Sequence, residues 1–251
     1  MVKNFLKYIK PSSQNKILFF IEYIYLIVIN FLKLIIKKLS SIVPINYYEN
    51  LMPYALNFQY FRKIKNIKIF NSREKLWDYA IEKIGSNKPI LFMEFGTFEG
   101  YSIKYFAKKI QDQNSIFVGC DTFTGLPEKW NRMPKGMWDV EGNIPNTNDN
   151  RMKFVKGKFQ DTFDEINSYI DLDKNILFHF DADLYSSTLF LLTKLDYCKN
   201  YYAIFDEFTG HESRALYNYC QSFDAKVEFY GNTKGYANTP HRVFCKISKS
   251  N

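Results

Sequence analysis

The chain has 251 residues, 46% of them hydrophobic and 18% aromatic, which suffices for one α/β domain with a packed core and an appendage. Its four cysteines are scattered and its three histidines are few and lie far apart, which argues against a disulfide framework, a zinc site and a histidine-based metal site. The net charge of +8 is uneven, because residues 1–89 hold 15 Lys/Arg against 5 Asp/Glu and the remainder is nearly neutral. A nucleic-acid enzyme more often carries positive charge around its active site. We therefore expect the partner of this basic segment to be membrane phospholipid.

The first predicted element is a helix over residues 17–36, which is long enough to span a bilayer. Its polar residues Glu22, Asn30 and Lys33 fall with Lys37 on one narrow stripe, as in an interfacial helix or one docked on protein. A single span would carry the N-terminal lysines across the membrane, against the positive-inside tendency. Three alternatives stay open: a helix on the membrane surface, a helix packed on the domain or on a second copy of the chain, and a true span.

Residues 40–72 contain Pro44, Pro53 and many aromatic residues, and they predict an irregular or short helical connection. Apolar spacing over residues 73–84 predicts the helix that leads into the first strand, and the turn at 85–89 ends it. We therefore divide the chain into a basic, apolar helical appendage at 1–72 and an α/β domain at 73–251.

A strand, a turn and a helix follow one another at residues 90–110. The apolar run 90–93 is typical of a strand buried on both faces, and residues 102–110 have helical spacing. Gly96 and Gly100 lie where the backbone must turn sharply and admit a ligand. A second apolar run ends at Asp121, where a doubly wound fold holds ribose hydroxyls. These features predict a nucleotide-type site, and a generic tight turn is the alternative.

The residues around the turn favour S-adenosylmethionine (SAM) over a dinucleotide. Phe98 occupies the middle glycine position of the dinucleotide fingerprint. Glu94 and Glu99 would repel a pyrophosphate but suit a ligand that carries an ammonium and a sulfonium. The predicted cofactor contacts are Glu94, Gly96, Thr97, Gly100, Ser102, Asp121, Thr122, Gln160 and Asp161. Gln160 and Asp161 would meet the adenine amino group after a third strand, and capping of the next helix by Asp161 is the alternative.

Acidic residues end two further strand-like runs, at 176–180 and 202–205. One helix, at about 186–197, separates the runs, so the two strands should be parallel and adjacent or nearly so. Their carboxyl ends would then bring Asp181 close to Asp206 and Glu207, at the edge of the sheet where ligands bind. Three carboxylates without a basic partner predict a Mg²⁺ site. Such an ion lowers the pKa of a substrate hydroxyl, and a nearby base takes the proton. The alternative makes Asp181 a helix cap and Asp206 and Glu207 a solvated turn.

The long loop at residues 125–150 contains Trp130, Met133 and Trp138, and we interpret it as a lid that closes on substrate. A surface insertion is the alternative. His211 follows the acids and is either an auxiliary base facing the acceptor or a residue at a helix start. His179 alternates within a buried strand and is interpreted as structural, and His241 offers no specific signal.

The combined motifs resemble the macrocin O-methyltransferase (TylF-like) family of class I SAM-dependent methyltransferases. They are residues 181–188 (DADLYSST), 206–207 (DE) and 121–127 (DTFTGLP) with the glycine turn, and the resemblance covers roughly residues 90–247. It implies a doubly wound, mostly parallel seven-stranded sheet whose last strand, at about 241–247, is antiparallel. It also implies methyl transfer to a hydroxyl, typically on a sugar, with Asp181 as metal ligand and proton acceptor and with Asp206 and Glu207 completing the Mg²⁺ site. The family more often has paired aspartates, so Glu207 and Asp183 remain alternative third ligands.

The sequence therefore predicts a SAM-dependent, Mg²⁺-assisted O-methyltransferase that acts on a hydroxylated small molecule or glycan. Because SAM is made in the cytosol, we expect a cytoplasmic protein on the inner face of the membrane, and a homo-oligomer stays open. A nucleic-acid N-methyltransferase is a rival, but no Asn/Asp-Pro-Pro-Tyr/Phe tetrapeptide follows the fourth strand and acidic residues would repel phosphates. The other rival is a non-catalytic SAM-binding or membrane-surface scaffold.

Overall fold

The computed structural model describes residues 16–40, 42, 56, 64, 67–85, 87–130, 132–235 and 239–249. The chain divides into two compact units, Met1–Leu51 and Met52–Asn251, whereas the sequence placed the boundary after residue 72. The first unit contains helix α2 (Lys16–Leu39), so the predicted helix at 17–36 is confirmed and is slightly longer. Among the helices in the described ranges, none has the length and apolar character needed to cross a membrane. Most of the connection predicted at 40–72 lies outside the described residues.

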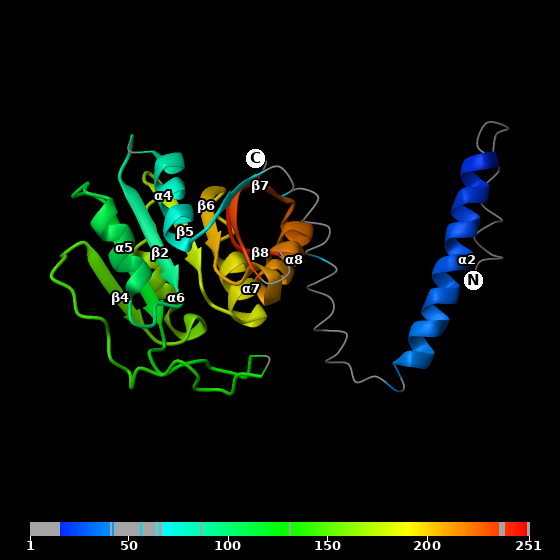
Figure 1. Ribbon diagram of the computed structural model, residues 1–251, viewed down its shortest axis with the longest axis horizontal. Coiled ribbons are helices and arrows are strands. Elements are labelled where there is room, and N and C mark those ends of the chain that lie inside the picture. The colour runs from blue at the N-terminus through cyan, green and yellow to red at the C-terminus, as the bar shows by residue number, and fades with distance from the viewer. Residues whose placement is uncertain are drawn as a thin grey trace. The chain divides into compact units, whose positions relative to one another are not determined.

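An eight-stranded sheet forms the centre of the second unit (Figure 1). Within it, β8 runs antiparallel to both of its neighbours, and the other described pairings are parallel. In spatial order the strands are β1 (Lys68–Phe70), β7 (Ala225–Lys234), β8 (Pro240–Lys249), β6 (Asn200–Phe205), β5 (Asn175–Phe180), β2 (Ile90–Phe95), β3 (Ile116–Asp121) and β4 (Met152–Lys156). The predicted doubly wound fold with a final antiparallel strand is confirmed. The predicted count of seven is wrong by one, because β1 adds an edge strand beside β7.

Helices cover both faces of the sheet, and each face has its own apolar core. Trp77 of α4 and Phe106 of α5 pack with Phe92 of β2 on one face. Leu191 of α7 and Leu216 of α8 belong to the core on the other face, to which α6 also contributes. The helices are α4 (Arg73–Ile84), α5 (Tyr101–Lys109), α6 (Phe159–Ser168), α7 (Tyr185–Lys194) and α8 (Ser213–Phe223), with a short wide helical turn, η2 (Phe208–Glu212), before α8. The helix predicted at 73–84 matches α4 at both ends.

The strand order changes direction beside β2. The chain passes from β2 outward to β3 and β4, then returns to β5 on the other side of β2 and continues to β6. Such a switch point leaves a crevice at the carboxyl ends of the strands, where open α/β sheets bind ligands. The glycine turn, Asp121 and the acids that follow β5 and β6 therefore reach the same edge of the sheet.

Candidate functional site

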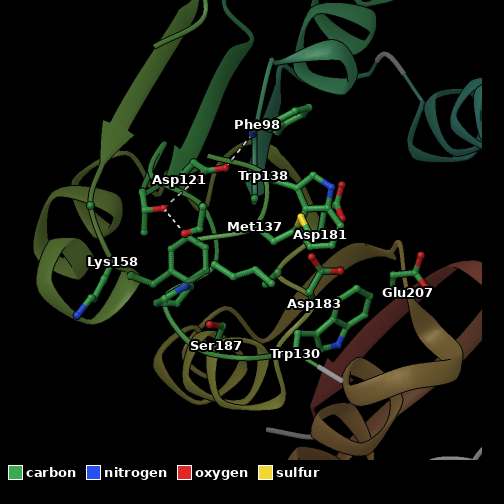
Figure 2. A pocket seen from close by; sticks show the side chains of 18 of the residues that line it. Phe98, Asp121, Trp130, Met137, Trp138, Lys158, Asp181, Asp183, Ser187 and Glu207 are labelled. Carbon is green, nitrogen blue, oxygen red and sulfur yellow. Dashed lines mark hydrogen bonds between the residues drawn. The ribbon is translucent and has the colours of Figure 1, made fainter. Parts of the chain in front are cut away.

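A cavity of about 240 Å³ lies at this edge (Figure 2). Its lining comes from the turn after β2, the end of β3, the long loop that follows β3, the start of α6, and the residues after β5 and β6. The lining residues are Gly96, Phe98, Asp121, Thr122, Gly125, Leu126, Pro127, Trp130, Met137, Trp138, Gly157, Lys158, Phe159, Gln160, Asp181, Ala182, Asp183, Ser187 and Glu207. Four predicted cofactor contacts are among them: Gly96, Asp121, Thr122 and Gln160.

Asp121 organises the turn after β2. Its Oδ2 accepts hydrogen bonds from the backbone N–H groups of Thr97 and Phe98, each at 2.8 Å, and its Oδ1 accepts one from Phe123 N–H at 2.8 Å. Gly96 has φ 100°, and a Cβ there would lie 1.9 Å from the carbonyl oxygen of Asp181, so the close approach of the turn to the end of β5 requires glycine. Asp121 therefore shapes the turn as well as lining the cavity, a structural role that the sequence prediction did not include.

Glu94 lies beneath the turn and not in the cavity. It is fully buried and accepts a hydrogen bond from Ser102 Oγ, and its Oε1 is 2.9 Å from His179 Nδ1. The reason is strand alternation, which directs Glu94 to the same face of β2 as Phe92 and toward α5. Five predicted cofactor contacts lie outside the cavity lining, so direct contact with the cofactor stays a prediction for them: Glu94, Thr97, Gly100, Ser102 and Asp161.

Helix α6 begins earlier than the sequence indicated. Lys158 occupies the N-cap position and Phe159 is the first helical residue, which places Asp161 in the first turn. The alternative that Asp161 caps this helix is therefore wrong. Gln160 lines the cavity from the same turn, and its predicted contact with the adenine stays a prediction.

The acids after β5 and β6 converge as predicted. Asp181, Asp183 and Glu207 line the cavity, and Figure 2 shows Asp181 and Asp183 between Asp121 and Glu207. Burial and the charge of Asp206 raise the pKa of Asp181 well above its usual range. Burial, followed by the charges of Glu207 and Asp206, raises the pKa of Asp183 to about 7. The carboxyl groups thus repel one another, which is the environment that attracts a cation.

Two of the three predicted acids, Asp206 and Glu207, have basic partners, so the prediction of three carboxylates without one is wrong for these two. Arg242 Nε donates to Asp206 Oδ1 at 2.7 Å, and His241 Nε2 is 2.8 Å from Glu207 Oε1. Burial alone would raise the pKa of Asp206, but His179 and Arg242 bring it down to about 2. The sequence prediction missed both partners because it considered the parallel strands only. Strand β8 pairs antiparallel with β6, so the start of β8 reaches the edge where β6 ends.

His179 lies between Glu94, which is beneath the glycine turn, and Asp206, which follows β6. It is completely buried on β5, and its Nε2 lies 3.8 Å from Asp206 Oδ1 while its Nδ1 faces Glu94. Burial alone would lower its pKa, but its interactions with Asp206 and Glu94 raise the pKa to about 10. Among the described residues, His179, Asp181 and Asp206 could hold a metal ion, because their donor atoms lie within 4.8 Å of one another.

Two residues of η2 follow the acids. His211 is partly buried and does not line the cavity, so its predicted role as an auxiliary base stays a prediction. Glu212, which the sequence prediction did not consider, is fully buried, and its Oε2 accepts a hydrogen bond from Glu207 N–H at 3.0 Å. Burial and the nearby charges of Asp181 and Asp183 raise the pKa of Glu212 well above its usual range. Glu212 therefore fixes the backbone that carries Glu207.

The long loop after β3 faces the cavity. Trp130, Met137 and Trp138 contribute to the lining, and the two indole rings lie 5.8 Å apart. The loop is tied to α7, since Ser186 Oγ donates to Glu128 Oε1 at 2.5 Å. This arrangement favours the predicted lid over a surface insertion, and closure on substrate stays a prediction.

Together, the fold and the site define a doubly wound, Rossmann-like protein with an acidic ligand cavity at its switch point. No family model and no curated protein sequence matches the chain. Among solved structures, the apo form of CalS11, a TDP-rhamnose 3'-O-methyltransferase of calicheamicin biosynthesis, is 18% identical, covers 80% of this chain and 94% of its own, and has a TM-score of 0.47. An O-methyltransferase from Bacillus cereus in complex with S-adenosylhomocysteine (SAH) is 12% identical, with coverages of 85% and 96% and a TM-score of 0.46. An rRNA methylase candidate from Clostridium thermocellum is 17% identical, with coverages of 74% and 99% and a TM-score of 0.46. Similarity at this level does not identify an activity or a substrate.

Proposed function

We propose that the protein is a SAM-dependent methyltransferase that methylates a hydroxyl group of a sugar or glycan-type small molecule. The observation that supports this most directly is a single cavity lined by the glycine turn with Asp121 and by Asp181, Asp183 and Glu207. A methyl donor on the turn and an acceptor beside the acids would then share one space. Orientation of the two reactants in that space would supply much of the rate.

The chemistry of the lining fits SAM. Gly96 lines the cavity without a side chain, so the turn offers its backbone to a ligand. The aromatic side chains of Phe98 and Phe159 offer apolar contact for a base, and Gln160 offers an amide that can both donate and accept hydrogen bonds. The carboxylate of Asp121 suits ribose hydroxyls and adds negative charge opposite a sulfonium. When bound, SAM supplies the electrophilic methyl group.

The donor set also fits a divalent cation, because hard ions such as Mg²⁺ prefer carboxylate oxygens. Asp181 and Asp206, with Glu207 or Asp183 as the third acid, are the residues that we propose to hold it. A bound cation would lower the pKa of an acceptor hydroxyl. Asp181 lines the cavity and is the residue that we propose to accept the hydroxyl proton, while the indoles of Trp130 and Trp138 would exclude water.

The cofactor can be tested by calorimetric titration of the full chain with SAH, with and without Mg²⁺. We expect Gln160→Ala to weaken SAH binding by about tenfold, which corresponds to one lost hydrogen bond of about 1.4 kcal/mol. Asp164→Ala is the matched control, since Asp164 is an exposed residue of the same helix outside the lining. Absence of SAH binding by the unaltered protein under both conditions would reject the proposal.

The acceptor can be tested with labelled SAM and parallel panels of neutral glycosides, nucleotide sugars and RNA. Transfer to a hydroxylated glycan supports the proposal, and transfer to RNA alone would identify the nucleic-acid rival. SAH binding without transfer to any acceptor, in the presence of divalent cations, would identify the scaffold rival.

We also propose that α2 attaches the protein to the inner face of the membrane. The helix is predominantly apolar and has Lys37 and Lys38 in its last turn, beside which an anionic lipid surface would be favourable. Co-sedimentation with phosphatidylglycerol vesicles, which salt should weaken, tests this attachment against neutral phosphatidylcholine vesicles. Equal recovery of a variant without residues 1–40 would refute it.

A further inference from the structure

The acidic site contains one side chain whose chemistry the proposed function does not use. His179 is completely buried, and its Nε2 has no hydrogen-bond partner among the described residues. That nitrogen lies 3.8 Å from Asp206 Oδ1, which is too far for a hydrogen bond. A buried polar atom without a partner is costly, and native proteins rarely keep one without a function.

The unpaired nitrogen belongs to a compact group of potential ligands. One donor atom from each of His179, Asp181 and Asp206 lies within 4.8 Å of the other two. Ligand atoms bound at about 2.0–2.2 Å lie no more than about 4.4 Å apart across a metal ion. The group therefore needs to contract by only about half an ångström to bind an ion, which side-chain rotation can supply.

The other ring nitrogen of His179 is held as a metal-binding histidine usually is. Nδ1 is 2.9 Å from Glu94 Oε1, and Ser102 Oγ donates to the same carboxylate oxygen. A carboxylate on one ring nitrogen fixes the tautomer and the ring orientation, so that a metal ion which displaces the proton of the other nitrogen can bind its lone pair. Glu94 is fully buried, so its carboxylate cannot form hydrogen bonds with solvent in place of those with His179 and Ser102.

Glu207 is less suited to be the third ligand. Its Oε1 is already 2.8 Å from His241 Nε2, and its side chain is 30% exposed, whereas that of His179 is 1% exposed. Asp206 also accepts a hydrogen bond from Arg242, but it differs from Glu207 in being buried and in lying 3.8 Å from His179 Nε2.

We propose that His179, Asp181 and Asp206 form a metal site, with Glu94 orienting His179 from behind, and that this site prefers a first-row transition-metal dication such as Mn²⁺ to Mg²⁺. Imidazole nitrogen suits transition metals, whereas Mg²⁺ prefers an all-oxygen environment. This inference puts His179 in the metal site in place of Glu207 or Asp183 and changes the preferred ion. Its catalytic meaning rests on the proposed function, but metal binding can be measured without any turnover.

The test uses the full chain and Mn²⁺ alone, in the absence of SAM and acceptor. Titration followed by the electron paramagnetic resonance (EPR) signal of free Mn²⁺ gives the affinity, and competition gives the affinity for Mg²⁺. Electron spin echo modulation of the Mn²⁺-loaded, unaltered protein reports directly whether a nitrogen is bound, so this measurement does not depend on a variant that folds. We expect nitrogen modulation and tighter binding of Mn²⁺ than of Mg²⁺.

Variants then assign the nitrogen and the carboxylates. His179→Gln should abolish the modulation, and His211→Gln and His241→Gln, which alter the other two histidines of the chain, should retain it. Glu94→Gln should weaken Mn²⁺ binding by about 10- to 100-fold, as expected for loss of the residue that orients a ligand. Glu207→Gln should change the affinity by less than about twofold. Circular dichroism of each variant checks that it is folded.

Absence of nitrogen modulation in the unaltered protein would overturn the inference. So would modulation that survives in folded His179→Gln, loss of Mn²⁺ binding in Glu207→Gln, or a preference for Mg²⁺. Titration with SAH is carried out in parallel, because the two proposals can fail separately. Nitrogen-bound Mn²⁺ without SAH binding would reject the methyltransferase proposal and keep the metal site, whereas SAH binding without bound nitrogen would do the reverse.

Discussion

Gly96→Ala should destabilise the protein more than an alanine at any glycine whose surroundings are open. The turn after β2 passes so close to the end of β5 that an added Cβ would lie 1.9 Å from the carbonyl oxygen of Asp181, whereas Cβ atoms in proteins stay beyond about 3.0 Å from such atoms. The turn and β5 would have to separate by about 1.1 Å, and both belong to the hydrogen-bonded centre of the sheet.

Gly136→Ala is a matched control for the effect of backbone conformation. Gly136 has φ 84° and Gly96 has φ 100°, so both substitutions place a side chain in the left-handed region. A Cβ at Gly136, however, would meet no atom within 4 Å. The conformational cost alone is about 1 kcal/mol. At Gly96 the steric overlap adds roughly 2–3 kcal/mol, the usual range for overpacking.

The difference between the two variants can be measured by urea unfolding followed by circular dichroism. We expect Gly136→Ala to lower the free energy of unfolding by about 1 kcal/mol and Gly96→Ala to lower it by roughly 3–4 kcal/mol. Because Asp181 is the residue displaced, folded Gly96→Ala should also bind Mn²⁺ and SAH more weakly. Equal destabilisation by the two variants would refute the idea that close approach of the turn to β5 requires Gly96.

Three further predictions concern the scaffold, pH and the lid. Arg151→Met should lower the free energy of unfolding, measured in urea, by about 2–3 kcal/mol. The Arg151 side chain is 12% exposed, and its guanidinium donates to the carbonyl oxygens of Ala107 and Ile110 and pairs with Asp149. Lys174→Met, which loses an ion pair with a half-exposed Asp171, should lower it by less than about 1 kcal/mol, and similar losses would contradict this account. The pKa of His179 is raised from 6.5 to about 10 in the metal-free fold, so its stabilising contribution is complete below pH 6.5 and is lost as the pH rises through 10. Unfolding in EDTA between pH 6.5 and 10 should therefore show a decline of at most about 1.4 kcal/mol per pH unit, which is absent from folded His179→Gln. Trp130→Ala should raise the KM for the acceptor about tenfold and leave SAH affinity within twofold, and an unchanged KM would argue against a lid that contacts the acceptor.

Much of the fold could be predicted from the sequence because its central elements carry strong local signals. The buried parallel strands are short apolar runs, and α4 has both the spacing and the flanking turn of a helix. Strand β1 has only three residues, Lys68–Phe70, and exists because β7 pairs with it from a distant part of the chain. No local pattern could reveal such an edge strand.

The residues of the site were predicted best where a single rule of sheet topology determines their position. Parallel strands bring their carboxyl ends together, and this rule alone located Asp121, Asp181 and Asp206. Arg242 was missed because it depends on the antiparallel pairing of β8 with β6; the family resemblance implied an antiparallel last strand, but the acids were placed from the parallel strands alone. Glu94 was predicted as a cofactor contact because it flanks the turn; its two-residue offset from Phe92 directs it to the face of β2 that carries α5, and contact with the cofactor stays a prediction.

The position of β8 determines when the site can exist during synthesis. This strand follows β7 along the chain yet lies between β6 and β7 in the sheet. Strand β7 therefore joins this part of the sheet only through its pairing with β8. A nascent chain that has reached only Lys234 would expose the edge of β6 and carry Asp206 and Glu207 without Arg242 and His241. Exposed strand edges are prone to aggregation. A chain that ends between β7 and β8 would therefore lack the finished sheet and the basic partners of Asp206 and Glu207 at the same time.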